Sequence, residues 1–171
     1  MTLRNPVRAQ DVLAQEGTSY PEPFGTRIGK GNWRALGDPF DLTQFGVNLE
    51  TLQPGAQSAL RHWHTLSDEF VLVVEGELVL RTDDGESLLK QGMCMGFKAG
   101  DQNAHHLVNR SALAVSFLVV GSRVPGDTAF YPDDDLVWFR TESGRIAAHK
   151  DGSPYPQAQS GVYKLKPPKE D

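Results

Sequence analysis

The stretch from Gly55 to Gly76 reads GAQSALRHWHTLSDEFVLVVEG and carries two histidines, His62 and His64, with one residue between them. In an extended strand, successive side chains point to opposite faces, so His62 and His64 would share one face and Trp63 would occupy the other. Imidazole nitrogens are good ligands for divalent transition metals. The pair is therefore placed so that both side chains can bind one ion.

A carboxylate follows the histidines closely. Glu69 lies five residues after His64 and opens the apolar run of residues 70–74, which predicts a second strand. A tight turn over residues 65–68 would bring Glu69 beside the two histidines. Together they would supply two nitrogens and one oxygen to a metal ion.

A fourth ligand is expected from the stretch GMCMGFKAGDQNAHHLVN at residues 92–109. His105 and Asn109 are four residues apart and share one face of a strand, whereas His106 lies on the opposite face. Both histidines are candidates for the fourth ligand, and the spacing to Asn109 favours His105.

These positions resemble the two conserved motifs of the cupin superfamily over roughly residues 42–120. The first motif is matched by Gly55, His62, His64, Glu69 and Gly76, and the second by Gly92, Gly100, His105 and Asn109. Lys98 stands where the family usually has proline. The resemblance implies an all-β chain folded as a cupin-type double-stranded β-helix (jelly-roll) barrel. It also implies that the metal ligands are His62, His64, Glu69 and His105.

The bulk composition narrows the range of partners. The chain has 171 residues, a net charge of −5 and a single cysteine, Cys94. The negative charge disfavours nucleic acid and anionic membrane surfaces as partners. One cysteine cannot form an intrachain disulfide, and the N-terminus has no signal-peptide pattern, so a cytoplasmic location is expected. No apolar run approaches the ~20 residues that span a bilayer.

The sequence divides into one barrel with two flanking segments. Residues 1–41 are rich in turn residues and are expected to form an N-terminal arm. Residues 42–121 hold both metal motifs and are expected to form the barrel core, with strands at 42–53, 57–64, 69–75, 77–82, 86–90, 93–97, 104–109 and 113–120. Residues 122–171 are expected to form a hairpin and a tail that packs on the barrel. Residues 69–74 are apolar on both faces, so either the terminal arms or a second copy of the chain should cover the outer face, and we predict a homodimer.

Three imidazoles and one carboxylate define the chemistry that we expect. This donor set suits one divalent transition metal, such as Fe, Mn, Zn or Ni, and is a poor match for calcium, which prefers oxygen ligands alone. Four protein ligands leave two positions of an octahedral ion open to a small molecule. The ion can then act as a Lewis acid or activate dioxygen. Glu69 has an alternative role as a general base.

The fold does not select one reaction. The first hypothesis is a metal-dependent enzyme that acts on a small, oxygen-chelating metabolite, either as a sugar-phosphate isomerase or as a dioxygenase. The alternative is a cupin that binds a sugar or an effector without catalysis. A polar cavity with basic residues would favour the isomerase, and a narrow apolar cavity would favour dioxygen chemistry. No catalytic residue beyond the metal ligands is identified from the sequence.

Overall fold

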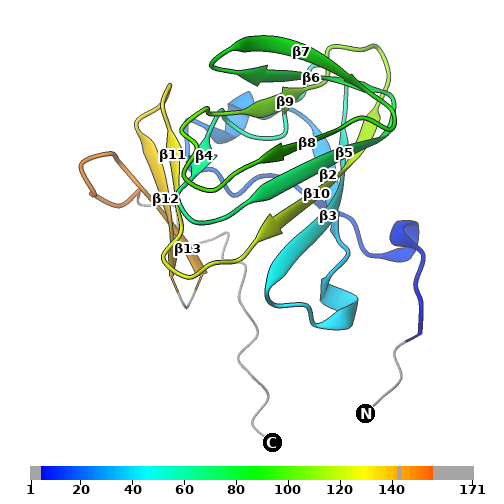
Figure 1. Ribbon diagram of the computed structural model, residues 1–171, viewed down its shortest axis with the longest axis horizontal. Coiled ribbons are helices and arrows are strands. Elements are labelled where there is room, and N and C mark those ends of the chain that lie inside the picture. Colours follow the sequence, from blue (N-terminus) through cyan, green and yellow to red (C-terminus); the bar gives the residue numbers. More distant parts are fainter. Residues whose placement is uncertain (1–4, 142–143, 156–171) are drawn as a thin grey trace, which may run out of the picture.

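The computed structural model describes residues 5–141 and 144–155 (Figure 1). The described chain is built almost entirely from antiparallel strands, as the sequence predicts. The strands are β1 (Gln15–Glu16), β2 (Gly31–Ala35), β3 (Phe45–Leu52), β4 (Trp63–His64), β5 (Glu69–Glu75), β6 (Glu77–Thr82), β7 (Gly85–Lys90), β8 (Cys94–Phe97), β9 (His106–Val108), β10 (Val115–Ser122), β11 (Thr128–Tyr131), β12 (Leu136–Thr141) and β13 (Gly144–Ala148).

The strands form three sheets. The largest has six strands in the order β1-β2-β3-β10-β5-β8, and the second has four in the order β13-β12-β11-β4. The third has three strands in the order β7-β6-β9 and lies beyond β8 in Figure 1. The helices of the described chain are three-residue 3₁₀ turns at Ala9–Asp11, Gly25–Arg27 and Asp38–Phe40, none of which could span a membrane.

The main core lies between the six-stranded and three-stranded sheets. Strands with period-2 alternation place every second side chain in this core. Its buried residues are Leu52, Ala56, Val71, Val73, Leu78, Leu80, Leu89, Leu107, Val115 and Phe117. In β5, Glu69, Val71 and Val73 face inward, while Phe70 and Val74 face outward with 39% and 43% of their surface exposed. The predicted alternation of β5 is therefore correct.

The segment before the second histidine differs from the prediction. A continuous strand over residues 57–64 was expected, but only Trp63–His64 forms one. The reason lies in the partners of its backbone amides: Gln57 donates to Ile28, Ser58 donates to Leu107, and Leu60 donates to the Tyr20 hydroxyl. Bonds to three different segments cannot form one ladder, so the chain crosses between sheets here.

The flanking segments add strands to the barrel. Strand β2, from the predicted N-terminal arm, pairs with β3 along five residues. The predicted final hairpin is present as β12 and β13, although its turn residues 142–143 lie outside the described chain. This sheet encloses a second core of Phe24, Leu60, Ala129, Tyr131, Leu136, Trp138, Ala147 and Tyr155. The tail from residue 156 onward also lies outside the described residues.

Candidate metal centre

The two predicted motifs meet directly through their backbones. His62 and His105 form an antiparallel bridge, in which the His62 amide donates to the His105 carbonyl at 3.1 Å and the reverse bond measures 2.8 Å. Residues paired in this way project their side chains to the same face. The two imidazole rings accordingly lie with their centroids 5.0 Å apart.

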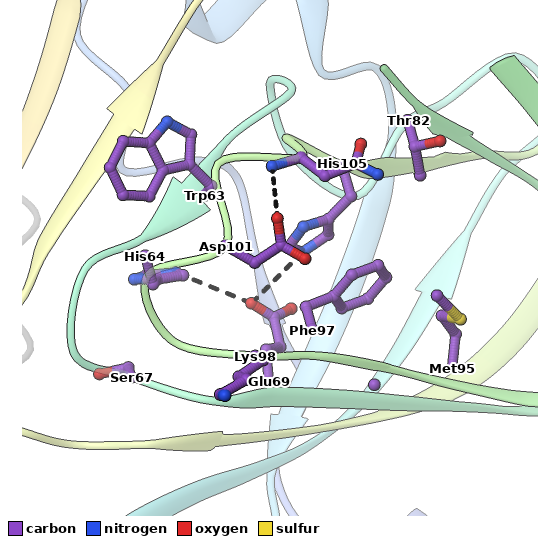
Figure 2. Close-up of a pocket in the computed structure, with 12 residues that line it drawn as sticks. Trp63, His64, Ser67, Glu69, Thr82, Met95, Phe97, Lys98, Asp101 and His105 are labelled. Atoms are coloured by element: carbon purple, nitrogen blue, oxygen red, sulfur yellow. Dashed lines mark hydrogen bonds and ion pairs between the residues drawn. The ribbon is translucent and has the colours of Figure 1, made fainter. Parts of the chain in front are cut away.

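Glu69 is the point on which all three histidines converge. Its Oε2 atom lies 3.8 Å from His62 Nε2, 3.7 Å from His64 Nε2 and 3.7 Å from His105 Nε2. Figure 2 shows Glu69 pointing up from β5 between His64 and His105. Ligand atoms bound at ~2.1 Å to one ion are separated by roughly 3–4 Å. His62, Glu69 and His105 offer ligand atoms that all lie within 4.8 Å of one another and could hold one ion, whereas His64 approaches Glu69 but falls outside this group.

His62 and His64 are held by hydrogen bonds on the far side of each ring. His62 Nδ1 donates to the Leu60 carbonyl at 2.8 Å, and His64 Nδ1 donates to Asp127 Oδ2 at 2.7 Å. Both acceptors can only accept, so the proton of each neutral ring sits on Nδ1. The Nε2 lone pairs are thereby directed toward Glu69, as metal binding requires.

The sequence did not reveal Asp127. This carboxylate is 3% exposed and also accepts bonds from the Leu66 and Ser67 amides at 2.9 and 3.3 Å. Burial alone would raise its pKa, but the hydrogen bonds from His64 and Leu66 hold the pKa well below its usual range. Asp127 reaches the site because β11 pairs with β4, placing Ala129 opposite His64. Asp127 lies 63 residues after His64, so no local sequence pattern could have linked the two residues.

His105 is placed differently from the other two rings. Its ring stacks on Phe97 with centroids 3.4 Å apart, and neither buried nitrogen has a hydrogen-bond partner in the described chain. Buried nitrogens without partners are costly, and a metal ligated at one of them would remove part of that cost. Burial lowers the pKa of His105, so the ring is in the neutral form that binds metals. Burial alone would raise the pKa of Glu69. Its interactions with His105 and His62 outweigh this effect and hold the pKa well below its usual value.

A small cavity of about 50 Å3, open to solvent, adjoins Glu69, His64 and His105. Its remaining lining residues are Trp63, Ser67, Thr82, Met95, Gly96, Phe97, Lys98, Asp101 and Asn103. Lys98 and Asp101 are exposed at this cavity, and the buried Ser67 hydroxyl has no partner among the described residues (Figure 2). The lining is therefore mixed, with polar side chains beside the apolar surfaces of Trp63, Met95 and Phe97.

The other residues singled out from the sequence lie outside the cluster. His106 faces away from it and bonds the Ala59 carbonyl through Nδ1 at 3.0 Å. Asn109 is fully buried and donates to the carbonyls of Leu52 and Leu113. Trp63 stacks on Phe130 with centroids 4.9 Å apart, and it also lines the cavity, which its strand face had not suggested.

The fold and the sequence together define the class of protein. The family model described as "Cupin domain" matches residues 48–121, which contain all four converging residues. The chain belongs to the cupin superfamily and holds a single cupin domain.

Among solved structures, the chain is similar to a sugar phosphate isomerase from a cupin superfamily of Silicibacter pomeroyi. The two are 43% identical with a TM-score of 0.84, covering 88% of this chain and 96% of the other. A predicted oxalate decarboxylase from Thermotoga maritima is 18% identical, with a TM-score of 0.57 and coverage of 69% and 98%. The polyketide cyclase RemF from Streptomyces resistomycificus is 21% identical, with a TM-score of 0.56 and coverage of 70% and 80%. These last two support the fold alone. No curated protein matches the chain.

Proposed function

We propose that this protein is a metal-dependent enzyme that isomerises a small sugar phosphate. The observation that carries the proposal is the convergence of three imidazole Nε2 atoms on one carboxylate oxygen, at 3.7–3.8 Å, beside a cavity that Lys98 and Asp101 help to line. The similarity to the Silicibacter pomeroyi protein supports the choice of substrate.

The four converging residues would hold the ion. His62, His64 and His105 would supply neutral nitrogens and Glu69 a carboxylate oxygen, a donor set suited to Fe, Mn, Ni or Zn. When bound, the ion would supply Lewis-acid polarisation of a substrate carbonyl, which lowers the cost of removing a proton from the neighbouring carbon.

The cavity residues would bind the substrate and move its proton. The Lys98 ammonium would pair with the phosphate at the mouth, and Ser67 and Thr82 would hydrogen-bond the hydroxyl groups. Isomerisation transfers one proton between adjacent carbons and one between their oxygens, so atoms balance without a second reactant. Asp101 is the lining carboxylate outside the ligand set and would carry the proton between carbons.

Two other functions are distinguished by the same cavity. The basic side chain of Lys98 in the lining favours a phosphorylated substrate over a dioxygenase, for which a narrow apolar pocket is expected. Binding of a sugar without turnover remains the alternative, because a metal and this cavity serve both roles.

The test combines metal analysis with solvent exchange. We expect about one transition-metal ion per chain by elemental analysis, lost in His62→Ala and His105→Ala. The loaded protein, incubated in deuterated water with pentose 5-phosphates and hexose 6-phosphates, should exchange the proton beside the carbonyl, as followed by NMR. Lys98→Met should raise KM mainly for phosphorylated sugars, and Asp101→Asn should lower kcat.

The contrary outcomes are distinct. Saturable sugar binding without exchange would support the binding alternative, and substrate-dependent oxygen consumption would support a dioxygenase. If the protein takes up no metal, both the isomerase and the dioxygenase would be contradicted.

A further inference from the structure

The inner face of the six-stranded sheet carries three polar side chains outside the metal cluster. Trp33 on β2 pairs with Glu50 on β3, and Glu50 pairs in turn with Phe117 on β10. Directly paired residues share a face, and Phe117 is fully buried in the core. Trp33 and Glu50 therefore point into the barrel.

Asn48 lies in the adjacent row of the same face. It pairs with the buried Ala35 on β2 and with Val119 on β10, which packs against the core. On its other side Val119 pairs with Val71 of β5, and Val71 shares the inner face of β5 with Glu69. The polar groups on β2 and β3 and the candidate metal centre thus belong to one interior surface.

This surface is accessible although β3 is an interior strand. Neighbouring strands cover both edges of β3, yet Asn48, Glu50 and Val119 each retain partial exposure. The accessible area must therefore come from space on a face of the sheet, and these three residues face inward.

The three polar groups lack hydrogen bonds within the described chain. The Trp33 indole Nε1 is buried without a partner, and neither the Asn48 carboxamide nor the Glu50 carboxyl has a hydrogen bond to a described residue. Buried polar groups are nearly always hydrogen-bonded, so the unpartnered Trp33 indole, next to two partly exposed polar side chains that bond no described residue, indicates a place that receives polar atoms from outside the chain.

Their chemistry selects the ligand. The indole donates, and the carboxamide both donates and accepts. Burial, followed by repulsion from Glu69, raises the pKa of Glu50 to about 8, so at neutral pH the carboxyl keeps its proton and can also do both. Uncharged groups that donate and accept match hydroxyl groups.

We propose that Trp33, Asn48 and Glu50 form a subsite that binds the hydroxyl groups of a sugar-like ligand on the inner face of β2 and β3. The subsite deepens the proposed function and rests on it for the choice of a sugar. It would orient the uncharged part of the substrate, while Lys98 meets its charged end.

The experiment measures binding of a neutral polyol, D-sorbitol, by ligand-observed NMR titration of the full-length protein, both metal-loaded and treated with chelator. Trp33→Phe removes only the indole donor, and Glu50→Leu removes the carboxyl. Each should weaken binding about tenfold, the loss of one or two hydrogen bonds. Glu50→Gln keeps a donor and an acceptor and should bind within about twofold of the wild type.

The matched control is Thr51→Val, which lies on the outer face of the same strand and bonds Ser116 there. It should leave sorbitol binding unchanged, and near-UV circular dichroism checks that each variant is folded. The subsite is overturned if the wild type does not bind sorbitol, or if folded Trp33→Phe and Glu50→Leu bind as the wild type does. Failure of the proposed function would look different, because turnover would be absent while sorbitol binding kept its dependence on these residues.

Discussion

At the scale of single residues, the candidate site depends on groups outside the proposed ligand set. Asp127 and the Leu60 carbonyl fix the rings of His64 and His62 by bonding their Nδ1 atoms. A ligand whose ring is free to turn must be ordered on binding, which lowers affinity. The identity of the four converging residues is thus only part of what builds the centre.

Asp127→Asn should weaken metal binding by roughly 10- to 100-fold, because an amide cannot compensate the charge that develops on the His64 ring. Competition with a fluorescent chelator measures this directly. Asp135→Asn is the matched control, since Asp135 also accepts a bond from a histidine, His149, far from the ligands in sequence. Equal metal affinity in the wild type and Asp127→Asn would show that His64 needs no support or does not bind the ion.

Glu50 gives the stability a defined pH dependence in chelator-treated protein. Its pKa is raised from 4.5 to about 8, so the folded state holds a proton that the unfolded state releases. Stability should therefore fall as pH rises from about 4.5 to about 8 and level off above, by on the order of 1–3 kcal/mol. Urea unfolding across this range should show a flatter profile for Glu50→Gln. The exposed-site variant Glu16→Gln should keep the wild-type slope, and a slope unchanged in Glu50→Gln would refute the assignment.

At the scale of elements, the alternation within strands was predictable, but the partners of irregular segments were not. The period of two placed Glu69, Val71 and Val73 correctly on one face. The prediction of a strand at 57–64 was wrong because the backbone amides of this segment bond three separate segments. No local sequence pattern encodes such a tertiary arrangement. Asp127 was missed for the same reason: only the pairing of β11 with β4 brings it to His64.

The connection between β5 and β6 depends on a glycine for two separate reasons. Gly76 has φ +83°, and a Cβ there would lie 2.9 Å from Val115 Cγ2. Gly92 has the same φ of +83° but no atom within 4 Å of the corresponding Cβ position. The two positions therefore separate backbone strain from steric overlap.

Gly92→Ala should lower the free energy of unfolding by about 1–2 kcal/mol, the cost of a left-handed alanine. Gly76→Ala should lower it by about 1–3 kcal/mol more, because Val115 is buried in the main core and must shift. Denaturant unfolding of both variants measures the difference. Equal losses would show that the core accommodates the added methyl group.

At the scale of the whole molecule, the outer face of the six-stranded sheet is apolar across three strands. Side chains on this face come from β3, β10 and β5 and are all at least partly exposed: Phe45, Val47, Leu49, Leu118, Val120, Phe70, Leu72 and Val74. Monomeric proteins rarely expose contiguous apolar faces of this extent. A second copy of the chain remains our prediction for the cover.

Phe70→Glu should convert the predicted homodimer into a monomer, because it places a charge within the apolar outer face. Multi-angle light scattering with size-exclusion chromatography reports the mass. Leu88→Glu is the control: Leu88 is 45% exposed, against 39% for Phe70, but lies on β7 in a different sheet. A monomeric wild type, or equal behaviour of the two variants, would contradict the homodimer.

The bridge between His62 and His105 has a consequence for how the proposed site would acquire a metal ion. Two backbone hydrogen bonds join the motifs, and neither depends on the metal. Folding should therefore precede loading, and the ion should be exchangeable in the native protein. The metal found after purification would then reflect its supply in the producing cell, so activity should be compared after reconstitution with each candidate ion in turn.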